Sequence, residues 1–296
     1  MIAPNCPADV THLISLGAGV QSSTMALMAA HGLIEPRPAA AIFADTQDEP
    51  ESVYRWLDQL EGIIKAAPFP FPIHRVTAGQ LSARALQFRT AKSGRVYTKT
   101  DIPFHTLSAK GEIGMVKARA CTFDFKIAPI LKEARRLGNV KRGQKTVGVV
   151  QWIGISTDEI QRMKPSREAW CESRWPLVEL RMNRAACLRW MESNGYPKPP
   201  RSSCVFCPYH SDAEWRRLKL EEPVAFERAV AFERAVASTK AVASTKADTD
   251  NFHSTAFLHK SCKPLDTVDF STEEERGQGS LWNDNFTSEC EGICGV

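Results

Sequence analysis

The segment from Val10 to His31 constrains the fold more than any other part of this 296-residue chain. The apolar residues 10–16 predict a buried strand. A turn of small residues, Gly-Ala-Gly at 17–19, follows, and residues 22–31 are rich in Ala, Met and Leu, as in a helix. Glycine lets a backbone approach a phosphate closely, and a helix N-terminus offers N–H groups to an anion. The segment therefore predicts a strand, an anion-binding loop and a helix.

The same alternation continues downstream. Apolar runs at residues 39–44, 72–76 and 146–155 predict further strands, and residues 50–66 have the apolar spacing of a helix. Strands and helices in this order predict an α/β fold with a doubly wound parallel sheet.

The composition changes after the last predicted strand, where Trp, Pro and Cys become more frequent. We therefore expect two domains: residues 1–165, which carry the loop, and residues 166–296, a cysteine-rich, mainly helical C-terminal part with a tail. The chain has nine cysteines, many for a reducing compartment and an odd number. Such a set indicates metal or redox chemistry before disulfides.

Charge and hydropathy narrow the setting of the protein. The formal net charge of +4 is compatible with a polyanionic partner without requiring one. No apolar run reaches about 18 residues, so we expect no membrane span. Residues 1–11 lack the basic-then-apolar order of a signal peptide, so we expect a cytoplasmic protein.

Residues 89–119 are rich in Lys, Arg, Thr and Gly and show no clear hydrophobic period. We expect no regular structure there, and a stretch of this kind is usually functional or disordered. Basic residues among aromatic ones can follow a nucleic-acid strand, whereas a solvated charged surface is the simpler interpretation. The basic residues are Arg89, Lys92, Arg95, Lys99, Lys110, Lys117 and Arg119, and the aromatic residues are Phe88, Tyr97 and Phe104.

Two hexapeptides are each repeated in tandem. Residues 224–229 and 230–235 read Val-Ala-Phe-Glu-Arg-Ala, and residues 236–241 and 242–247 read Val-Ala-Ser-Thr-Lys-Ala. Six is not a multiple of the roughly 3.6 residues of a helical turn, so two copies of one apolar stripe do not share a helix face. We interpret the repeat as a recent duplication. We expect a helix that is longer than the fold needs or is poorly packed.

Cys204 and Cys207 form a Cys-x-x-Cys turn. Two thiolates at this spacing can hold zinc or an iron–sulfur cluster, or can act as a redox dithiol. No second Cys-x-x-Cys follows at zinc-ribbon spacing, which weighs against zinc. The alternative is unrelated buried cysteines, since free Cys packs well. We expect plain packing for Cys6, Cys171, Cys187 and Cys262.

Charged groups near the predicted strand ends could complete a site, because open α/β sheets bind ligands there. Asp158 or Glu159 could hold Mg²⁺, and Arg162 could neutralise phosphate oxygens. Acidic residues at a helix N-terminus are the alternative interpretation. Lys126 and Arg119 could bind phosphate or lie on a solvated basic surface.

The loop resembles a known family. Residues 17–23, Gly-Ala-Gly-Val-Gln-Ser-Ser, resemble the pyrophosphate loop Ser-Gly-Gly-x-Asp-Ser-Thr of the adenine nucleotide alpha-hydrolase superfamily. Residues 45–49, Asp-Thr-Gln-Asp-Glu, resemble the Asp-Thr-Gly-x-Glu of its phosphoadenosine phosphosulfate (PAPS) reductase branch. That branch includes sulfonucleotide reductases and the ATP pyrophosphatases of DNA phosphorothioation. Gly17 and Gln21 stand where the family has Ser and Asp, so this loop lacks a carboxylate that would help to hold Mg²⁺.

The cysteines extend the resemblance. Residues 121–130 are similar to the Cys-Cys-x-x-x-Lys-Val-x-Pro-Leu segment of cluster-containing sulfonucleotide reductases. In that group the segment joins a later Cys-x-x-Cys to hold a [4Fe-4S] cluster, which implies Cys121, Cys204 and Cys207 as ligands. Thr122 stands at the second cysteine of the family, so one iron lacks a ligand from these segments.

The tail around Cys290 and Cys294 faintly resembles the Glu-Cys-Gly tail of sulfonucleotide reductases. The resemblance implies a nucleophile, a sulfur carrier or a fourth cluster ligand. A loose terminus is the alternative.

The resemblance implies an ATP-dependent, iron–sulfur sulfurtransferase or ATP pyrophosphatase that acts on nucleic acid, either tRNA or DNA. One alternative is a sulfonucleotide reductase that uses a C-terminal cysteine. Another is a non-catalytic module that senses nucleotide or redox state, which Gln21 favours. The implied partners are a nucleic acid, a sulfur donor such as a cysteine desulfurase or a thioredoxin-type reductant, and a second copy in a homodimer.

The resemblance also implies the site residues. Those for the nucleotide are Gly17, Ala18, Gly19, Val20, Gln21, Ser22, Ser23, Asp45 and Thr46. Those with catalytic roles are Cys290, Cys294, Lys126 and Arg162. Those for metals are Cys121, Cys204, Cys207 and Cys290 for the cluster, and Asp158 for Mg²⁺.

Overall fold

The first half of the chain alternates strands and helices, as the sequence predicts. A computed structural model describes residues 10–90, 92–94, 96–98, 102–108, 110–116, 120–246, 254–272 and 275. The first elements are β1 Thr11–Leu16, α1 Val20–Ala30, β2 Ala40–Asp45, α2 Glu51–Ala66 and β3 Ile73–Thr77. Each overlaps the strand or helix expected from the sequence.

Five parallel strands form one sheet in the order β3-β2-β1-β8-β9. The last two are β8 Val149–Ile153 and β9 Cys171–Arg174. At the centre, Ile14 pairs with Ala41 on one side and with Trp152 on the other. The chain runs outward from β1 to β3 and then continues on the other side of β1. The α/β fold with a doubly wound, Rossmann-like order is therefore confirmed.

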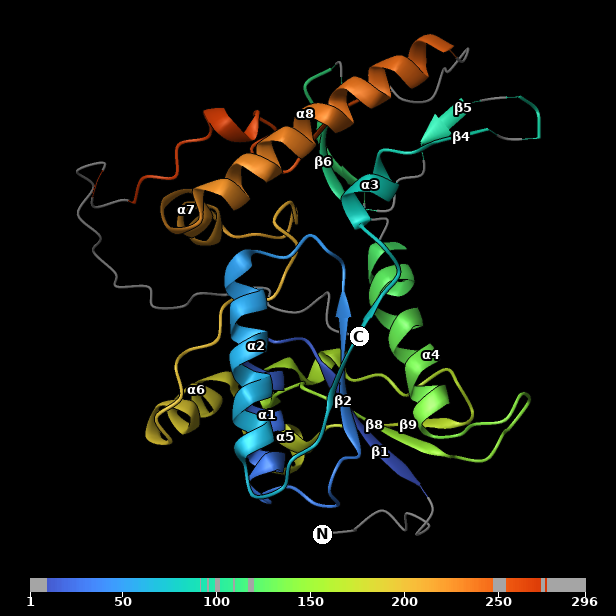
Figure 1. The fold of residues 1–296 in the computed structure, drawn as a ribbon. Helices are drawn as coiled ribbons and strands as arrows, with labels where there is room; N and C mark the ends of the chain where they lie inside the picture. Colours follow the sequence, from blue (N-terminus) through green and yellow to red (C-terminus); the bar gives the residue numbers. More distant parts are fainter. Residues whose placement is uncertain are drawn as a thin grey trace.

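Helices cover both faces of this sheet (Figure 1). α1, α2, α5 (Pro176–Glu179) and α6 (Arg184–Ser193) pack on one face, and α4 (Ala128–Leu137) packs on the other. α1 is buried on all sides, which explains why its sequence is apolar rather than amphipathic. α5 and α6 belong to this core although they follow the domain boundary expected near residue 165. The two-domain division itself stays a prediction.

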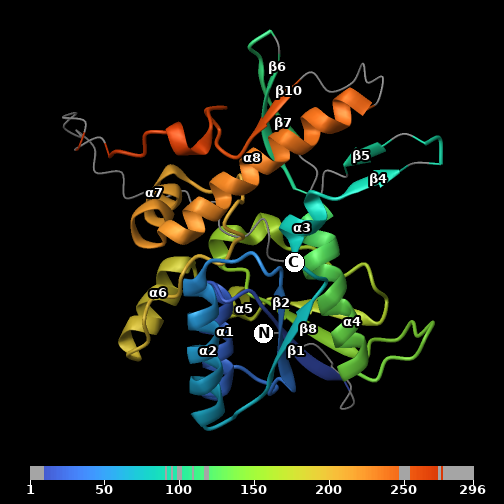
Figure 2. The ribbon, with the colours of Figure 1, turned by 45° about the horizontal axis from the view of Figure 1, so that its top comes forward.

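A second layer lies over the carboxyl ends of the strands (Figures 1 and 2). Its core combines Phe125 with Phe206 and Trp215, so segments from both halves of the chain build it. Its helical elements are α3 Leu81–Ala85, the π-helical turn η1 Thr122–Ile127, α7 Asp212–Glu221, α8 Pro223–Lys246 and the 3-10 turn η3 Leu265–Thr267.

Residues 89–119 contain short antiparallel strands, so the expectation of no regular structure is wrong. β4 pairs with β5, and β6 pairs with both β7 and β10. Their bounds are β4 Phe88–Thr90, β5 Val96–Thr98, β6 Phe104–Ser108, β7 Ile113–Val116 and β10 Ser254–Phe257. Strands β4 to β7 have three to five residues, which is too short to establish a clear alternation in the sequence.

Residues 224–246 of the hexapeptide repeats lie in the long helix α8, whose first half is well packed. Six residues make about one and two-thirds helical turns, so Phe226 and Phe232 point in different directions. Both are buried. Phe226 packs edge-on against Trp215 and Phe270, whereas Phe232 stacks on Phe206 with ring centroids 4.1 Å apart. Of the two expected alternatives, poor packing is wrong for this half of the helix, because each copy meets a different partner.

The C-terminal part is mainly helical and rich in buried cysteines, as predicted. The buried ones are Cys171, Cys187, Cys204, Cys207 and Cys262. Among the helices that the structure describes, none is both long and apolar enough to cross a membrane.

Candidate functional site

Three neighbouring strands end side by side at the carboxyl edge of the sheet. β1 leads into residues 17–19, β2 into residues 46–49, and β8 into residues 154–162, which end in the 3-10 turn η2 Thr157–Arg162. The strand order reverses between β1 and β8, and open α/β sheets bind ligands at this switch point. The edge thus brings together the loop and the two polar segments that the sequence singled out.

The loop after β1 is shaped mainly by its backbone. Gly17 N–H donates to Ser22 Oγ over 3.2 Å, and that hydroxyl donates to Gly19 O over 3.3 Å. Ala18 has a φ of +59°, in the left-handed region that favours glycine. No side chain caps the N-terminus of α1. Its first N–H groups therefore face the edge and can bind an anion.

Two hydroxyls that follow the loop face the core instead. Ser23 Oγ accepts from Trp56 Nε1 over 2.9 Å, and Thr24 Oγ1 donates to Val20 O over 2.8 Å. Both side chains are fully buried. They hold α1 in place, and Ser22 is the hydroxyl that faces the loop.

Gln21 joins the loop to the residues after β8. Its amide donates to Ser156 Oγ over 3.4 Å and to Glu159 Oε2 over 3.3 Å. Burial raises the pKa of the Glu159 carboxyl, and Arg162, 2.7 Å away, opposes this effect. Asp158 accepts from Ser156 Oγ over 2.5 Å. A carboxylate thus lies beside the loop although the loop itself has none.

Asp45 ends β2, Thr46 follows it, and the two contact different parts of the molecule. Asp45 Oδ1 accepts from Tyr54 O–H over 2.8 Å. Burial, with the Asp45 carboxylate, raises the pKa of Tyr54 above its usual range. Thr46 is fully buried, and its Oγ1 lies 3.2 Å from Cys204 Sγ. Asp45 therefore contacts α2, and Thr46 contacts the cysteine segment.

Two buried carboxylates fasten the residues after β2 to the second layer. The Asp48 carboxylate lies 3.2 Å from Arg228 of α8. Glu49 Oε1 lies 3.2 Å from Lys126 Nζ, and Glu49 Oε2 accepts from Ser202 Oγ over 3.0 Å. Both acids are about 1% exposed, and a buried charge needs such partners. The sequence motif contains Glu49 but gives no sign of this bridging role.

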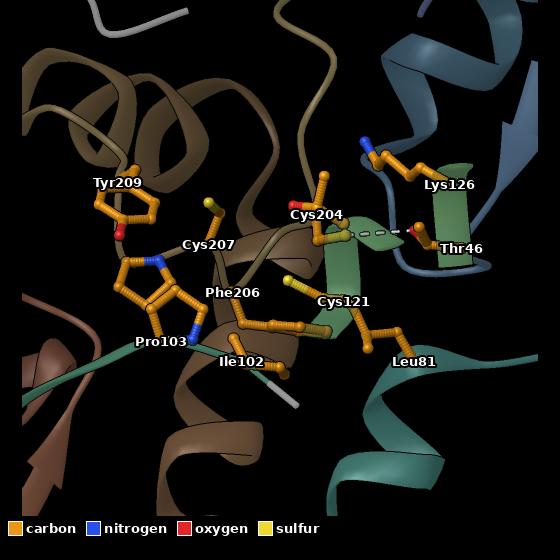
Figure 3. Close-up of a pocket in the computed structure, with 12 residues that line it drawn as sticks. Thr46, Leu81, Ile102, Pro103, Cys121, Lys126, Cys204, Phe206, Cys207 and Tyr209 are labelled. Carbon is orange, nitrogen blue, oxygen red and sulfur yellow. Dashed lines mark hydrogen bonds between the residues drawn. The ribbon is translucent and has the colours of Figure 1, made fainter. Parts of the chain in front are cut away.

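Cys121, Cys204 and Cys207 line one pocket (Figure 3). Its volume is about 470 Å³, including space that opens to solvent. The structure therefore brings together the three cysteines on which the sequence argument depends. The other lining residues are Thr46, Leu81, Ile102, Pro103, Thr122, Lys126, Phe206, Pro208 and Tyr209.

Cys121 lies directly before the π-helical turn η1. Turns of this kind are rare and occur often at functional sites. Cys121, Thr122 and Lys126 line the pocket, whereas Phe125 packs into the core and Phe123 is exposed. The turn thus presents a thiol, a hydroxyl and an ammonium group on the pocket side.

Three thiols and a buried hydroxyl in one pocket are the kinds of group that an iron–sulfur cluster would need. Within the described part of the chain, no three His, Cys, Asp or Glu side chains lie close enough to hold one ion. A [4Fe-4S] cluster binds each thiolate through a different iron, so its cysteines lie farther apart than the ligands of one ion. Thr122 Oγ1 is buried there with no hydrogen-bond partner among the described residues. A ligand with acceptor sulfides would satisfy it.

His210 supports the Cys-x-x-Cys turn, a role that sequence reasoning missed. Its Nε2 lies 3.0 Å from the Cys204 carbonyl oxygen, and its ring packs edge-on against Trp215. Burial lowers the pKa of His210 to about 3, so the ring is neutral and its Nε2–H donates. Its place three residues after Cys207 was the available signal.

The remaining cysteines and aromatic residues behave differently. Cys171, Cys187 and Cys262 are buried and form no disulfide. Burial raises the pKa of Cys171 to about 11 and that of Cys187 to about 12, as in inert packed thiols.

Phe104 is buried against Phe232, so it does not offer a face to a nucleic-acid base. Outside the described residues lie Cys6, Arg95, Lys99, Lys117, Arg119, Cys290 and Cys294.

Comparison of the chain with protein-family models, curated proteins and solved structures finds no match. The fold itself defines the class. The chain is an α/β protein with a five-stranded, doubly wound parallel sheet, and a layer that carries cysteines covers the carboxyl edge of that sheet.

Proposed function

We propose that this protein is a PAPS reductase-like enzyme that uses ATP and an iron–sulfur cluster to transfer sulfur to a nucleic acid, tRNA or DNA. One observation carries the proposal. The pocket lined by Cys121, Cys204 and Cys207 also includes Thr46, which follows the strand next to the loop of residues 17–23. The loop proposed to bind phosphate and the three thiols thus share one edge of the sheet.

The loop and the charged residues around it would activate the acceptor. The N–H groups at the start of α1 bind the phosphates of ATP, and Asp158 supplies an oxygen ligand of the kind that Mg²⁺ prefers. An acceptor oxygen attacks the α-phosphorus, and pyrophosphate leaves. Arg162 and Lys126 stabilise the charge that develops in this step. Sulfide then attacks the activated centre and AMP leaves. If a cysteine persulfide attacks instead, its outer sulfur stays on the acceptor, a second cysteine thiol takes up the inner sulfur as a disulfide, and a thioredoxin-type reductant restores both thiols.

The cysteines would serve the second step. Cys121, Cys204 and Cys207 would hold a [4Fe-4S] cluster, and Thr122 would donate a hydrogen bond to it. A cluster held by these residues would supply a binding site for sulfide. Cys290 or Cys294 would be the fourth ligand or the carrier of a persulfide.

The test is release of AMP and pyrophosphate from ATP by anaerobically purified protein, with and without tRNA or DNA. We expect release that nucleic acid stimulates, and sulfur in the product. Cys204→Ala should lose sulfur transfer, whereas the matched control Cys171→Ala should retain it. Sulfite release from a sulfonucleotide with thioredoxin would contradict the proposal and identify a reductase.

Gln21 favours a second candidate, a module that binds nucleotide and senses redox state without catalysis. Residues 17–23 contain no carboxylate that could hold a metal ion. The neutral amide of Gln21 donates to Ser156 and Glu159 instead. ATP binding with no AMP release in the presence of tRNA or DNA would support this candidate against the transferase.

A further inference from the structure

Thr46 lies both at the carboxyl edge of the sheet and in the wall of the cysteine pocket. Its backbone continues directly from β2 at the carboxyl edge. Its hydroxyl, fully buried, lies 3.2 Å from Cys204 Sγ in the wall of the cysteine pocket (Figure 3). Thr46 therefore links the end of a central strand directly to a cysteine sulfur.

The hydrogen bonds around Thr46 favour donation toward sulfur. The Asp48 backbone N–H donates to Thr46 Oγ1 over 3.4 Å. This occupies one lone pair of the Thr46 oxygen, and when Cys204 is a thiolate only the Thr46 hydroxyl can donate across their contact. A hydroxyl that donates to a thiolate stabilises its negative charge, and it fixes the position of the sulfur.

The surrounding contacts make the link stiff. The Asp48 carbonyl accepts from Val205 N–H over 2.8 Å, one residue after Cys204. Glu49 forms an ion pair with Lys126, in the segment that carries Cys121. It also accepts a hydrogen bond from Ser202, which precedes the Cys-x-x-Cys turn. A shift of the residues after β2 therefore moves both cysteine segments.

We propose that Thr46 is a positioning residue that couples the nucleotide edge of the sheet to the cysteine pocket through its hydrogen bond to Cys204. The inference rests on the proposed function, since it assumes that nucleotide binds at this edge. Binding there changes the residues after β2, and the hydroxyl transmits the change to the sulfur. By linkage, the state of the pocket changes the affinity for nucleotide to the same extent.

The test compares wild type with Thr46→Val, which removes the hydroxyl at constant shape, and with Thr46→Ser, which keeps it. Thr77→Val is the matched control, because Thr77 ends β3 on the same edge and is exposed. Isothermal titration with ATP first establishes binding in each variant. The first readout is the midpoint reduction potential of the cluster-containing protein with and without ATP.

We expect Thr46→Val to have a more negative potential, because a hydrogen bond to a cysteine sulfur stabilises the reduced cluster. ATP should shift the potential of wild type, Thr46→Ser and Thr77→Val, and should leave that of Thr46→Val unchanged. Equal ATP-dependent shifts in wild type and Thr46→Val would overturn the inference.

A second readout does not need the cluster. In metal-free protein with Cys121→Ser and Cys207→Ser, the rate of Cys204 alkylation by iodoacetamide is measured by mass spectrometry. ATP should change this rate about fivefold, the lower end of ordinary coupling between sites, and Thr46→Val should abolish the change. No effect of ATP in wild type, or the same effect in Thr46→Val, would overturn the inference. Absence of iron and sulfide would instead defeat the proposed function and leave this readout intact.

Discussion

The loop after β1 and the cysteine pocket lie on one edge of the sheet but are built in different ways. The loop owes its shape to backbone geometry, with Ala18 at positive φ and the hydroxyls of Ser23 and Thr24 turned into the core. The pocket owes its chemistry to side chains, three thiols among apolar and aromatic groups. A substitution that adds a side chain beside the backbone should therefore distort the loop. A substitution that removes a buried side chain should destabilise the pocket.

The largest predicted loss of stability comes from removing a buried aromatic side chain that lines the pocket. Phe206 is 1% exposed and stacks on Phe232. Phe206→Ala should lower the free energy of unfolding by about 3–5 kcal/mol, the usual cost of removing a buried phenyl ring. Urea unfolding measures it.

Phe123→Ala is the matched control, since Phe123 lies in the same layer but is 53% exposed. Its effect should stay within about 0.5 kcal/mol. Equal losses in the two variants would show that the pocket does not depend on its packed side chains.

A smaller effect is predicted for an added methyl group beside the loop. A Cβ at Gly154 would lie 2.9 Å from both the N and the Cα of Ser22. Gly154→Ala should therefore displace the start of α1, destabilise the fold by about 1–3 kcal/mol and weaken ATP binding. Denaturant unfolding and calorimetric titration measure the two effects.

Gly62→Ala is the control for the added methyl group. Gly62 lies in helix α2, and a Cβ there would meet nothing within 4 Å. This change should stabilise the protein by about 0.5–1 kcal/mol and leave ATP binding unchanged. Unaltered ATP affinity in Gly154→Ala would contradict a loop that depends on backbone shape.

The smallest predicted effect is a pH dependence on the pocket side. Burial lowers the pKa of folded His210 to about 3, against 6.5 for an ordinary histidine, so the unfolded chain binds the proton first. Stability from His210 is therefore present above about pH 6.5 and is lost as pH falls, by about 1 kcal/mol between pH 7 and pH 5.5. His210→Gln should show a pH slope that is shallower by this amount in urea unfolding; an unchanged slope would argue against a buried neutral His210.

Glu159, on the loop side, acts in the opposite sense. Burial raises the pKa of its carboxyl above 4.5, so its stabilising contribution is present below that value and is lost as pH rises. A fall in pH thus lowers the stability contributed by His210 on the pocket side and raises that contributed by Glu159 on the loop side.

The sequence predicts the regular parts of this arrangement well. Apolar runs and small-residue turns indicate β1, the loop and α1, and the family resemblance indicates the grouping of Cys121 with Cys204 and Cys207. The pattern cannot show that Ser23 faces Trp56, because both faces of a fully buried helix look alike in sequence.

Tertiary contacts determine what the sequence leaves open. The two copies around Phe226 and Phe232 have the same sequence, yet each meets different partners. The bond from His210 to the Cys204 carbonyl likewise depends on the burial of that turn. Local sequence carries no signal for the first contact, and for the second its only signal is the place of His210 three residues after Cys207.

The most direct test of the central claim, that the pocket holds an iron–sulfur cluster beside a nucleotide edge, is the iron and acid-labile sulfide content of anaerobically purified protein. We predict a brown wild-type protein with about four irons and four sulfides per chain. Cys121→Ala should lose both and still bind ATP, and Cys171→Ala should keep both. A colourless wild-type protein, whether loaded with zinc or free of metal, would contradict the account.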